Sequence, residues 1–318
     1  TGKVAVRDLC LRVQHGECFG FLGVNGAGKT TTFSMLTGEL TPTAGDALLG
    51  GLSSLTHQRA IRKLVGFCPQ HDALQPLMTA REMLRLYARI KAVPRAEIEG
   101  EVRSLLADLD LDAIADKPCG TYSGGNKRKL CVAIALVGAP RLVLLDEPSS
   151  GMDAASKRFL WSAIRRRTAR CCTVLTTHSM EECEALCARI GVMVDGVLRC
   201  VGPIQALKSR YGRGFKLDFR LDVAAGGGAD DVLAFMRARV DGVALEEHEP
   251  PMLTLSVPRG GVPLGELFRH VADARDALRV HECSVTQSTL EQVFVTMASR
   301  SDLHADAEKS EGADEPTS

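Results

Sequence analysis

From residue 1 to about residue 205, hydrophobic residues form short apolar runs that alternate with segments of helical periodicity. The apolar runs predict β-strands at residues 4–13, 18–22, 65–68, 142–146, 173–176 and 190–194. Asp195-Gly196 follows the last of these, and this dipeptide suits a tight turn. We therefore expect a hairpin with a further strand at 197–200.

Two helices are expected between the strands at 65–68 and 142–146. Thr79 and Glu82 have the spacing of a capping box, and Met83, Leu86, Tyr87 and Ile90 then follow at one-face spacing. A second helix starts at Pro94 and carries an apolar stripe that we expect to pack in the core: Ile98, Val102, Leu105, Leu106 and Leu109. Strands that alternate with helices predict an α/β domain with a mostly parallel sheet.

The pattern changes after about residue 210. Strands are expected at residues 215–221, 243–248, 252–257 and 278–285, with helices at 231–240 and 264–274. This order is that of a small α+β domain of the ferredoxin-like type. A helical segment is expected at 288–299, and the acidic residues 301–318 predict a disordered tail. The predicted domains are therefore 1–210 and 211–300, followed by the tail at 301–318.

Composition limits the classes of function. The chain has 318 residues, and 45% are hydrophobic, as expected for globular domains. Its 39 basic residues balance 39 acidic ones, which argues against a dedicated nucleic-acid binder. Eleven cysteines without a CxxC pair favour reduced thiols. No run approaches the roughly 18 to 20 apolar residues that span a bilayer, and the chain starts inside an expected strand, so we expect a segment of a longer polypeptide.

The segment GVNGAGKTT, residues 23–31, is the first candidate for chemistry. It fits the phosphate-loop pattern of a glycine, four residues and Gly-Lys-Thr, and it lies between an expected strand and an expected helix. Glycines let backbone N–H groups face a phosphate, and the helix N-terminus adds a positive dipole end. Lys29 is placed to reach the β- and γ-phosphates of a nucleotide, and the Thr30 hydroxyl to bind Mg²⁺.

Three later strand ends carry further polar groups. The strand at 142–146 ends in Asp146 and Glu147, which suits a Mg²⁺ ligand and a base for the water that attacks a γ-phosphate. Gln70 follows the strand at 65–68, where an amide can meet Mg²⁺ or that water, and His178 follows the strand at 173–176. Each of these residues alone is typical of an ordinary surface or core position. Their joint occurrence in this order indicates hydrolysis of a nucleotide.

A second pair of glycines, in YSGGNKRKL at residues 122–130, also opens an expected helix. Together with the phosphate loop, Gln70, LDEPSSGMD and His178, it resembles the ATP-binding cassette family over residues 1 to about 205. The resemblance implies a P-loop ATPase domain with a mostly parallel sheet and a helical subdomain. It also implies that two cassettes pair head to tail, and that the YSGGN signature of each caps the ATP of the other.

The resemblance assigns roles to particular positions. It implies that Glu147, His178 and Gln70 are catalytic. Mg²⁺ would be bound by Thr30, Gln70 and Asp146. The implied nucleotide contacts are Gly23, Asn25, Gly26, Gly28, Lys29, Thr30, Thr31, Ser123, Gly124, Gly125, Asn126 and Asp153.

Finer details are similar to subfamily A, whose members are large membrane transporters of lipids and related amphiphiles. FCPQHDAL and THSMEECEALCARI match, and SVTQSTLEQVFVTMA resembles the end of that subfamily's regulatory domain, in which Val293, Phe294 and Val295 form a hydrophobic motif. The resemblance implies ATP and Mg²⁺ as cofactors, a second cassette and transmembrane domains as partners, a lipid-like substrate and no nucleic acid. It places the domain on the cytosolic face of a membrane protein. Because no hydrophobic span follows the tail, we expect the second cassette of two.

Two segments depart from the family pattern. The usual Leu-Ser-Gly-Gly-Gln is here Tyr-Ser-Gly-Gly-Asn, and Ser150 stands where the subfamily often has threonine; neither implies an inactive site. The adenine-stacking aromatic residue would precede Thr1, so base preference is not predicted. Two alternatives stay open: a soluble cassette ATPase that acts on ribosomes or DNA, and a regulatory ATP-binding module with little turnover. The basic runs at 127–129 and 165–167 are expected to be solvated helix faces.

Overall fold

The structure, a computed structural model, describes residues 4–169, 171–212, 214–222, 228–258, 260, 262–278, 280–287 and 289–294. The chain forms two compact units, Thr1–Pro203 and Ile204–Ser318. Each unit has its own sheet and its own hydrophobic core. The boundary near residue 210 that the sequence predicts falls inside helix α8, Ile204–Tyr211, which belongs to the second unit.

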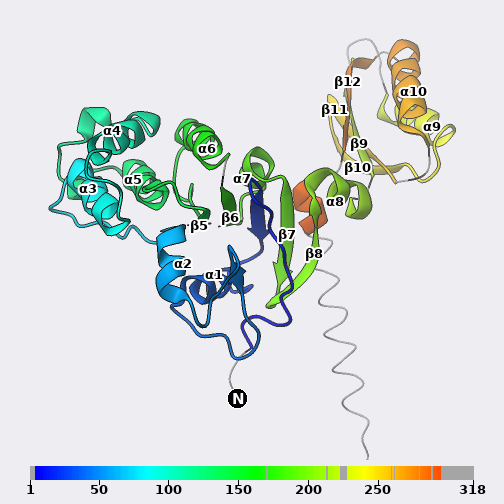
Figure 1. The fold of residues 1–318 in the computed structure, drawn as a ribbon. Helices are drawn as coiled ribbons and strands as arrows, with labels where there is room; N and C mark the ends of the chain where they lie inside the picture. Colours follow the sequence, from blue (N-terminus) through cyan, green and yellow to red (C-terminus); the bar gives the residue numbers. More distant parts are fainter. Residues whose placement is uncertain are drawn as a thin grey trace, which may run out of the picture. The chain divides into compact units, whose positions relative to one another are not determined.

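The first unit is built on a six-stranded sheet in the order β4-β5-β6-β1-β7-β8 (Figure 1). Neighbouring strands are parallel except for β7 and β8, which form the expected antiparallel hairpin. The strands are β1 Cys18–Leu22, β4 Val65–Cys68, β5 Leu142–Asp146, β6 Cys172–Thr177, β7 Arg189–Val194 and β8 Val197–Pro203. A separate two-stranded hairpin consists of β2 Leu48–Leu49 and β3 Leu52–Ser53. The prediction of a mostly parallel sheet is thus confirmed.

In the described part of this unit, seven α-helices lie between the strands. They are α1 Lys29–Thr37, α2 Gln58–Leu64, α3 Ala80–Ile90, α4 Ile98–Asp108, α5 Gly124–Leu136, α6 Ala154–Thr168 and α7 Met180–Leu186, with 3₁₀ turns at Asp112–Ile114 and Cys119–Thr121. Helices α3, α4 and α5 contact one another and form the helical part of the unit (cyan to green in Figure 1), and α5 also packs on β4. Among the described residues, no helix combines the length and the apolar character needed to cross a bilayer.

The capping box of α3 forms as the sequence predicts. The Thr79 hydroxyl accepts a hydrogen bond from the Glu82 N–H at 3.2 Å, and the Glu82 carboxylate accepts one from the Thr79 N–H at 2.9 Å. The expected face of α3 is only partly the one that packs inside, because Met83 is buried but Leu86 and Ile90 are 42% and 64% exposed. Leu84, which is not expected there, is buried. The expected stripe of α4 is buried throughout.

Residues 4–13 do not form the strand that the sequence predicts. Their apolar side chains do pack inside, because Val6, Leu9, Leu11 and Val13 contact the core of the unit. The backbone, however, does not pair into a ladder, and Asp8 has a φ of 47°, which interrupts an extended path. A strand needs a paired neighbour as well as an apolar face, and only the second requirement is visible in the sequence.

Close packing between β4 and α5 depends on a glycine. A Cβ atom on Gly66 would lie 1.8 Å from the carbonyl oxygen of Ala135 in α5 and 3.1 Å from Cγ of Pro140. Only a residue without a side chain allows this approach. The turn that follows β4, which carries Gln70, is therefore held against the helix that begins at the YSGGN segment.

The second unit has the elements in the predicted order. They are β9 Phe215–Leu221, α9 Ala229–Arg237, β10 Ala244–Glu249, β11 Met252–Val257, α10 Leu264–Ala277 and β12 Val280–Gln287. The strands pair as an antiparallel sheet in the order β10-β11-β9-β12. That this unit is a regulatory domain of the ferredoxin-like type stays a prediction. Val293 is buried in a helical segment, whereas Val295 and the acidic residues 301–318 lie outside the described residues.

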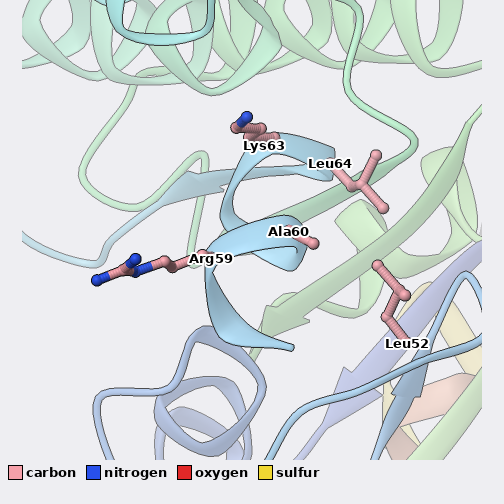
Figure 2. A pocket seen from close by; sticks show the side chains of 5 residues that line it. All are labelled: Leu52, Arg59, Ala60, Lys63 and Leu64. Carbon is pink, nitrogen blue, oxygen red and sulfur yellow. The ribbon is translucent and has the colours of Figure 1, made fainter. Parts of the chain in front are cut away.

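A surface hollow at α2 is unrelated to the predicted chemistry. It is lined by Leu52, Arg59, Ala60, Lys63 and Leu64 (Figure 2). The aliphatic side chains face a common space, while the two cationic side chains extend away from it. The predicted site residues are not part of this lining, and their position follows from the sheet.

Candidate active site

Four neighbouring parallel strands bring the predicted site together. Strands β4, β5, β6 and β1 are adjacent and run in the same direction, so their carboxyl ends meet at one edge of the sheet. This edge is where α/β proteins bind ligands. Directly beyond the four strands lie Gln70, Glu147, His178 and the phosphate loop that begins at Gly23. Residues that are more than 150 positions apart in the sequence thus share one edge.

The loop between β1 and α1 has the backbone that a phosphate needs. Gly26 and Gly28 have φ angles of 84° and 101°, a region that residues with a side chain rarely adopt. Lys29 opens α1 and is only 6% exposed, and its ammonium group donates to the carbonyl oxygens of Gly23 at 2.6 Å and Val24 at 3.1 Å. The lysine therefore curls back over the loop, with its charge inside the turn.

Asp146 and Thr30 are in direct contact. The Thr30 hydroxyl donates to the Asp146 carboxylate at 3.2 Å, and the Thr176 hydroxyl of β6 donates to the other carboxylate oxygen. Asp146 is 2% exposed, so its charge depends on such partners. Two of the three residues that the resemblance assigns to Mg²⁺ thus present a hydroxyl and a carboxylate side by side, which is a hard oxygen donor set that suits this cation.

Glu147 and His178 form a second pair. The His178 Nδ1 lies 2.9 Å from the Glu147 Oε2. Glu147 is 5% exposed and has a φ of 51°, a left-handed conformation that is uncommon for a residue with a side chain. Its N–H donates to the Thr176 carbonyl at 3.1 Å, which ties this conformation to the end of β6. The strained backbone aims the carboxylate toward the histidine.

The charges of the site are coupled. Burial lowers the pKa of Lys29, while the negative charges of Glu147 and Asp146 raise it. The buried Lys29 ammonium group is thus close to the carboxylates of Glu147 and Asp146. Phosphate oxygens of a bound nucleotide would add further negative charge beside it. An added Cβ on Gly26 would meet no atom within 4 Å, so there is open space beside this residue. This space, the Lys29 ammonium group and the two carboxylates fit a nucleoside triphosphate with Mg²⁺.

The remaining predicted residues of this half lie around the loop. Asn25 is exposed, Thr31 is half-buried in the first turn of α1, and Gln70 is exposed. The Gln70 carbonyl is held by Arg128 at 3.2 Å. In the part of the chain that the structure describes, the hydrogen bonds of Asp146 and Thr30 go to other groups and not to the Gln70 side chain. A role of Gln70 as a Mg²⁺ ligand or in catalysis therefore stays a prediction.

The YSGGN segment forms a separate surface. The Ser123 hydroxyl caps α5 by accepting from the Asn126 N–H at 3.3 Å. A Cβ on Gly124 would meet no atom within 4 Å, and one on Gly125 would reach only Met152. Asp153, the next residue, caps α6 by accepting from the Ser156 N–H at 3.0 Å, and this bonding lowers the pKa of its carboxyl group. The signature is therefore an exposed helix N-terminus with room for a partner.

Arg128 is a site residue that the sequence interpretation misses. It is 4% exposed, and its guanidinium group donates to five backbone carbonyls. The acceptors are Pro69 at 2.6 Å, Gln70 at 3.2 Å, Glu147 at 3.0 Å, Pro148 at 3.3 Å and Asp146. One side chain on the signature helix thus joins the turn after β4 to the turn after β5.

The interpretation of residues 127–129 as a solvated face is wrong for two of the three. Lys129 is 8% exposed, and its ammonium group lies 4.8 Å from the ring centroid of Phe159. A signal was present, because the residues that follow in α5 are apolar on all sides and such a helix lies in the interior. In the other basic run, Arg165 and Arg166 are exposed, whereas Arg167 is half-buried and pairs with Asp108.

Comparisons with known proteins agree with this geometry. Residues 6–150 match the family described as ABC transporter. The retinal-specific phospholipid-transporting ATPase ABCA4 of Homo sapiens is 47% identical over 94% of this chain and 13% of its own length. The phospholipid-transporting ATPase ABCA3 of Rattus norvegicus is 45% identical over 93% of this chain and 17% of its own length. The chain thus spans 13% to 17% of the length of these relatives.

Solved structures share the fold. An ATP binding subunit of an ABC transporter has a TM-score of 0.60 and 25% identity, and covers 64% of this chain and 85% of its own. The dimeric bacterial ABC transporter cassette MJ0796 has a TM-score of 0.57 and 22% identity, and covers 63% of this chain and 90% of its own. With the phosphate loop, the Glu147–His178 pair and the signature helix in place on this fold, the chain belongs to the ABC transporter family, in which it is an ATP-binding cassette of the subfamily A type.

Proposed function

We propose that this chain is the ATP-hydrolysing engine domain of a subfamily A membrane transporter of lipid-like substrates. The observation that carries the proposal is the Glu147–His178 contact at 2.9 Å, placed beside the Asp146–Thr30 pair and the Lys29 ammonium group. A base, a hard cation site and a phosphate-binding cation at one sheet edge are the parts that phosphoryl transfer to water requires. The names of the curated relatives, which are phospholipid-transporting ATPases, support the substrate class.

The Glu147–His178 pair is placed to activate a water molecule for hydrolysis. With its proton on Nδ1, His178 donates to Glu147 Oε2 and fixes the carboxylate, which leaves Oε1 free to accept a proton from water. The water oxygen forms a bond to the γ-phosphorus, the bond from this phosphorus to the bridging oxygen of ADP breaks, and the proton passes to Glu147. Lys29 compensates the charge on the phosphate oxygens. Proton removal by a positioned base contributes a factor of about 10² to 10⁴ to the rate.

Binding of the nucleotide uses the remaining predicted residues. The backbone from Gly23 to Gly28 and the first turn of α1, with Thr31, would hold the phosphates. Thr30 and Asp146, with Gln70 as a further ligand, would hold Mg²⁺, which when bound neutralises charge on the β- and γ-phosphate oxygens. Asn25, at the exposed tip of the loop, would contact the nucleotide from the outside.

The signature would serve a second cassette. Ser123, Gly124, Gly125 and Asn126 lie at an exposed helix N-terminus, which favours an anion such as the γ-phosphate of a partner's ATP. Asp153 lies on the neighbouring segment and would cross the same interface. A nucleotide at a hundred times its dissociation constant stabilises the state that binds it by about 2.7 kcal/mol. Two nucleotides at the interface would favour the closed pair, and hydrolysis would release it.

Coupling to transmembrane domains would use the surface after Gln70. Leu77 is 88% exposed and Leu86 is 42% exposed, and both lie within or next to residues 71–87. Exposed large apolar side chains are candidates for a protein contact surface. In this proposal the domain works at the cytosolic face of a membrane, as part of a longer chain that contains a second cassette.

Light scattering of the Glu147→Gln chain tests the pairing. With MgATP we expect a dimer, and with MgADP a monomer, because the γ-phosphate is the group that both halves would bind. Adding Gly124→Asp should abolish the dimer, since a carboxylate would then face the γ-phosphate. Gly100→Asp is the matched control, because Gly100 is also exposed with no atom within 4 Å of an added Cβ, but lies in α4.

A dimer of undiminished stability in the Gly124→Asp chain would contradict the role of the signature. A monomer under every condition would contradict pairing between two copies, and the other cassette of the transporter would then be added. The alternative of a soluble cassette that acts on ribosomes or nucleic acid is not favoured by the relatives, which are transporters.

A further inference from the structure

A buried carboxyl group lies behind the Glu147–His178 pair. Glu182, in α7, is 1% exposed, and its Oε1 accepts a hydrogen bond from the Trp161 indole N–H in α6 at 3.0 Å. The side chains of Ser149 and Thr177 lie close to this carboxyl group and, as polar neighbours, lower its pKa. A buried carboxyl group is tolerated only when it is well hydrogen-bonded, so these contacts hold four side chains from four segments in one place.

Two of these partners adjoin the two halves of the candidate catalytic pair. Ser149 is two residues after Glu147 and is 2% exposed. Thr177 is the last residue of β6, immediately before His178, and is 1% exposed. The Thr177 hydroxyl also accepts from the Ser179 N–H at 2.9 Å, which shapes the turn that presents His178. Glu182 therefore links the segment that carries the base to the segment that carries the histidine.

The electrostatics agree with this closeness. Burial raises the pKa of Glu182, and the polar side chains of Ser149, Thr177 and Trp161 lower it. The charge of Glu147 raises it further, so the two carboxyl groups are near enough to interact. Glu181, the preceding residue, is by contrast exposed.

We propose that Glu182 is a positioning residue for ATP hydrolysis: by binding Ser149 and Thr177, it keeps the Glu147 carboxylate and the His178 imidazole at hydrogen-bond distance. The proposal rests on the function proposed above. Glu182 does not touch the reacting atoms, and it acts through the two segments that do. Its removal should therefore slow the chemical step and leave the affinity for nucleotide unchanged, because the phosphate loop makes no part of this contact.

Trp161 makes the contact observable. It is the single tryptophan of the chain, so all indole fluorescence comes from the ring that donates to Glu182. Loss of the acceptor should shift the emission, and a side chain that still accepts from the indole N–H should restore it. This signal reports on the contact without requiring turnover.

The experiment compares Glu182→Ala, Glu182→Gln, Ser149→Ala and the control Glu181→Gln in the 318-residue chain. For Glu182→Ala we expect kcat to fall about tenfold or more, as for a misplaced catalytic group, with KM for ATP within about twofold of the wild type. Glu182→Gln keeps size and acceptor, and should retain kcat and emission. Ser149→Ala removes one link while leaving Trp161 bonded, and should lower kcat with unchanged emission.

The outcomes separate this inference from the proposed function. A wild-type chain that does not hydrolyse ATP under conditions in which it binds ATP would overturn both. A wild-type chain that hydrolyses ATP, together with an unchanged kcat in Ser149→Ala and Glu182→Ala, would overturn the inference alone. So would a Glu182→Gln chain as slow as Glu182→Ala, or a loss that appears in KM instead of kcat. If Glu182→Ala does not fold, Ser149→Ala and Glu182→Gln decide the question by the same criteria.

Discussion

Replacement of Glu147 by glutamine is expected to lower the steady-state turnover of ATP by a factor of about 10² to 10⁴, the usual contribution of a positioned general base. The amide keeps the size of the side chain and its contact with His178, but it does not take a proton from water. Nucleotide binding should remain, because Lys29 and the phosphate loop are unchanged. Phosphate release, measured with saturating MgATP, is the direct readout, and equilibrium dialysis gives the affinity.

Glu181→Gln is the matched control for this substitution. It makes the same change at an exposed glutamate in α7, three residues after His178. Its turnover should equal that of the wild type. A Glu147→Gln chain that retains more than about a tenth of the wild-type rate would contradict the role of Glu147 as the base.

Replacement of Gly66 by alanine is expected to lower the free energy of unfolding of the first unit by about 3 kcal/mol, the upper end of the cost of overpacking. The added Cβ would lie 1.8 Å from the Ala135 carbonyl oxygen, so β4 and α5 must separate. The clash is with a backbone oxygen, which cannot be moved aside by a change of side-chain rotamer. Urea unfolding followed by Trp161 fluorescence measures the effect, since this tryptophan lies in the first unit.

Gly100→Ala is the opposite case in the same unit. Gly100 lies in α4 with open space where its Cβ would be, and alanine is the better helix former there, so stability should rise by about 0.5 to 1 kcal/mol. The difference in sign would show that contact with α5, and not the glycine-to-alanine change itself, determines the result. Equal effects at the two positions would contradict the close approach of β4 and α5.

The elements that position the site could be predicted from local sequence. Strands β1, β4 and β5 begin and end at the predicted residues, because buried parallel strands are continuous apolar runs bounded by polar residues. Since these strands are neighbours with β6, the polar residues that follow them had to meet at one edge. The placement of Asp146, Glu147 and His178 at one edge could thus be predicted on the condition that their strands are neighbours, and the observed strand order meets this condition.

Contacts between side chains of distant segments could not be predicted in this way. The bond from Trp161 to Glu182 joins two helices, and no periodicity relates the two positions. Arg128 belongs to a run of three basic residues, and its burial depends on what covers α5 on every side. Residues 4–13 show a second limit, because their apolar side chains pack against the core while the backbone does not pair into the predicted strand.

The five carbonyls that accept from Arg128 have a mechanical consequence. The turn after β4 and the turn after β5 are fastened to one planar group, so they behave as a single rigid piece. A displacement of the chain beyond Gln70 would therefore also shift the backbone of Glu147. The proposed hydrolysis step would in this way depend on the position of the turn after β4.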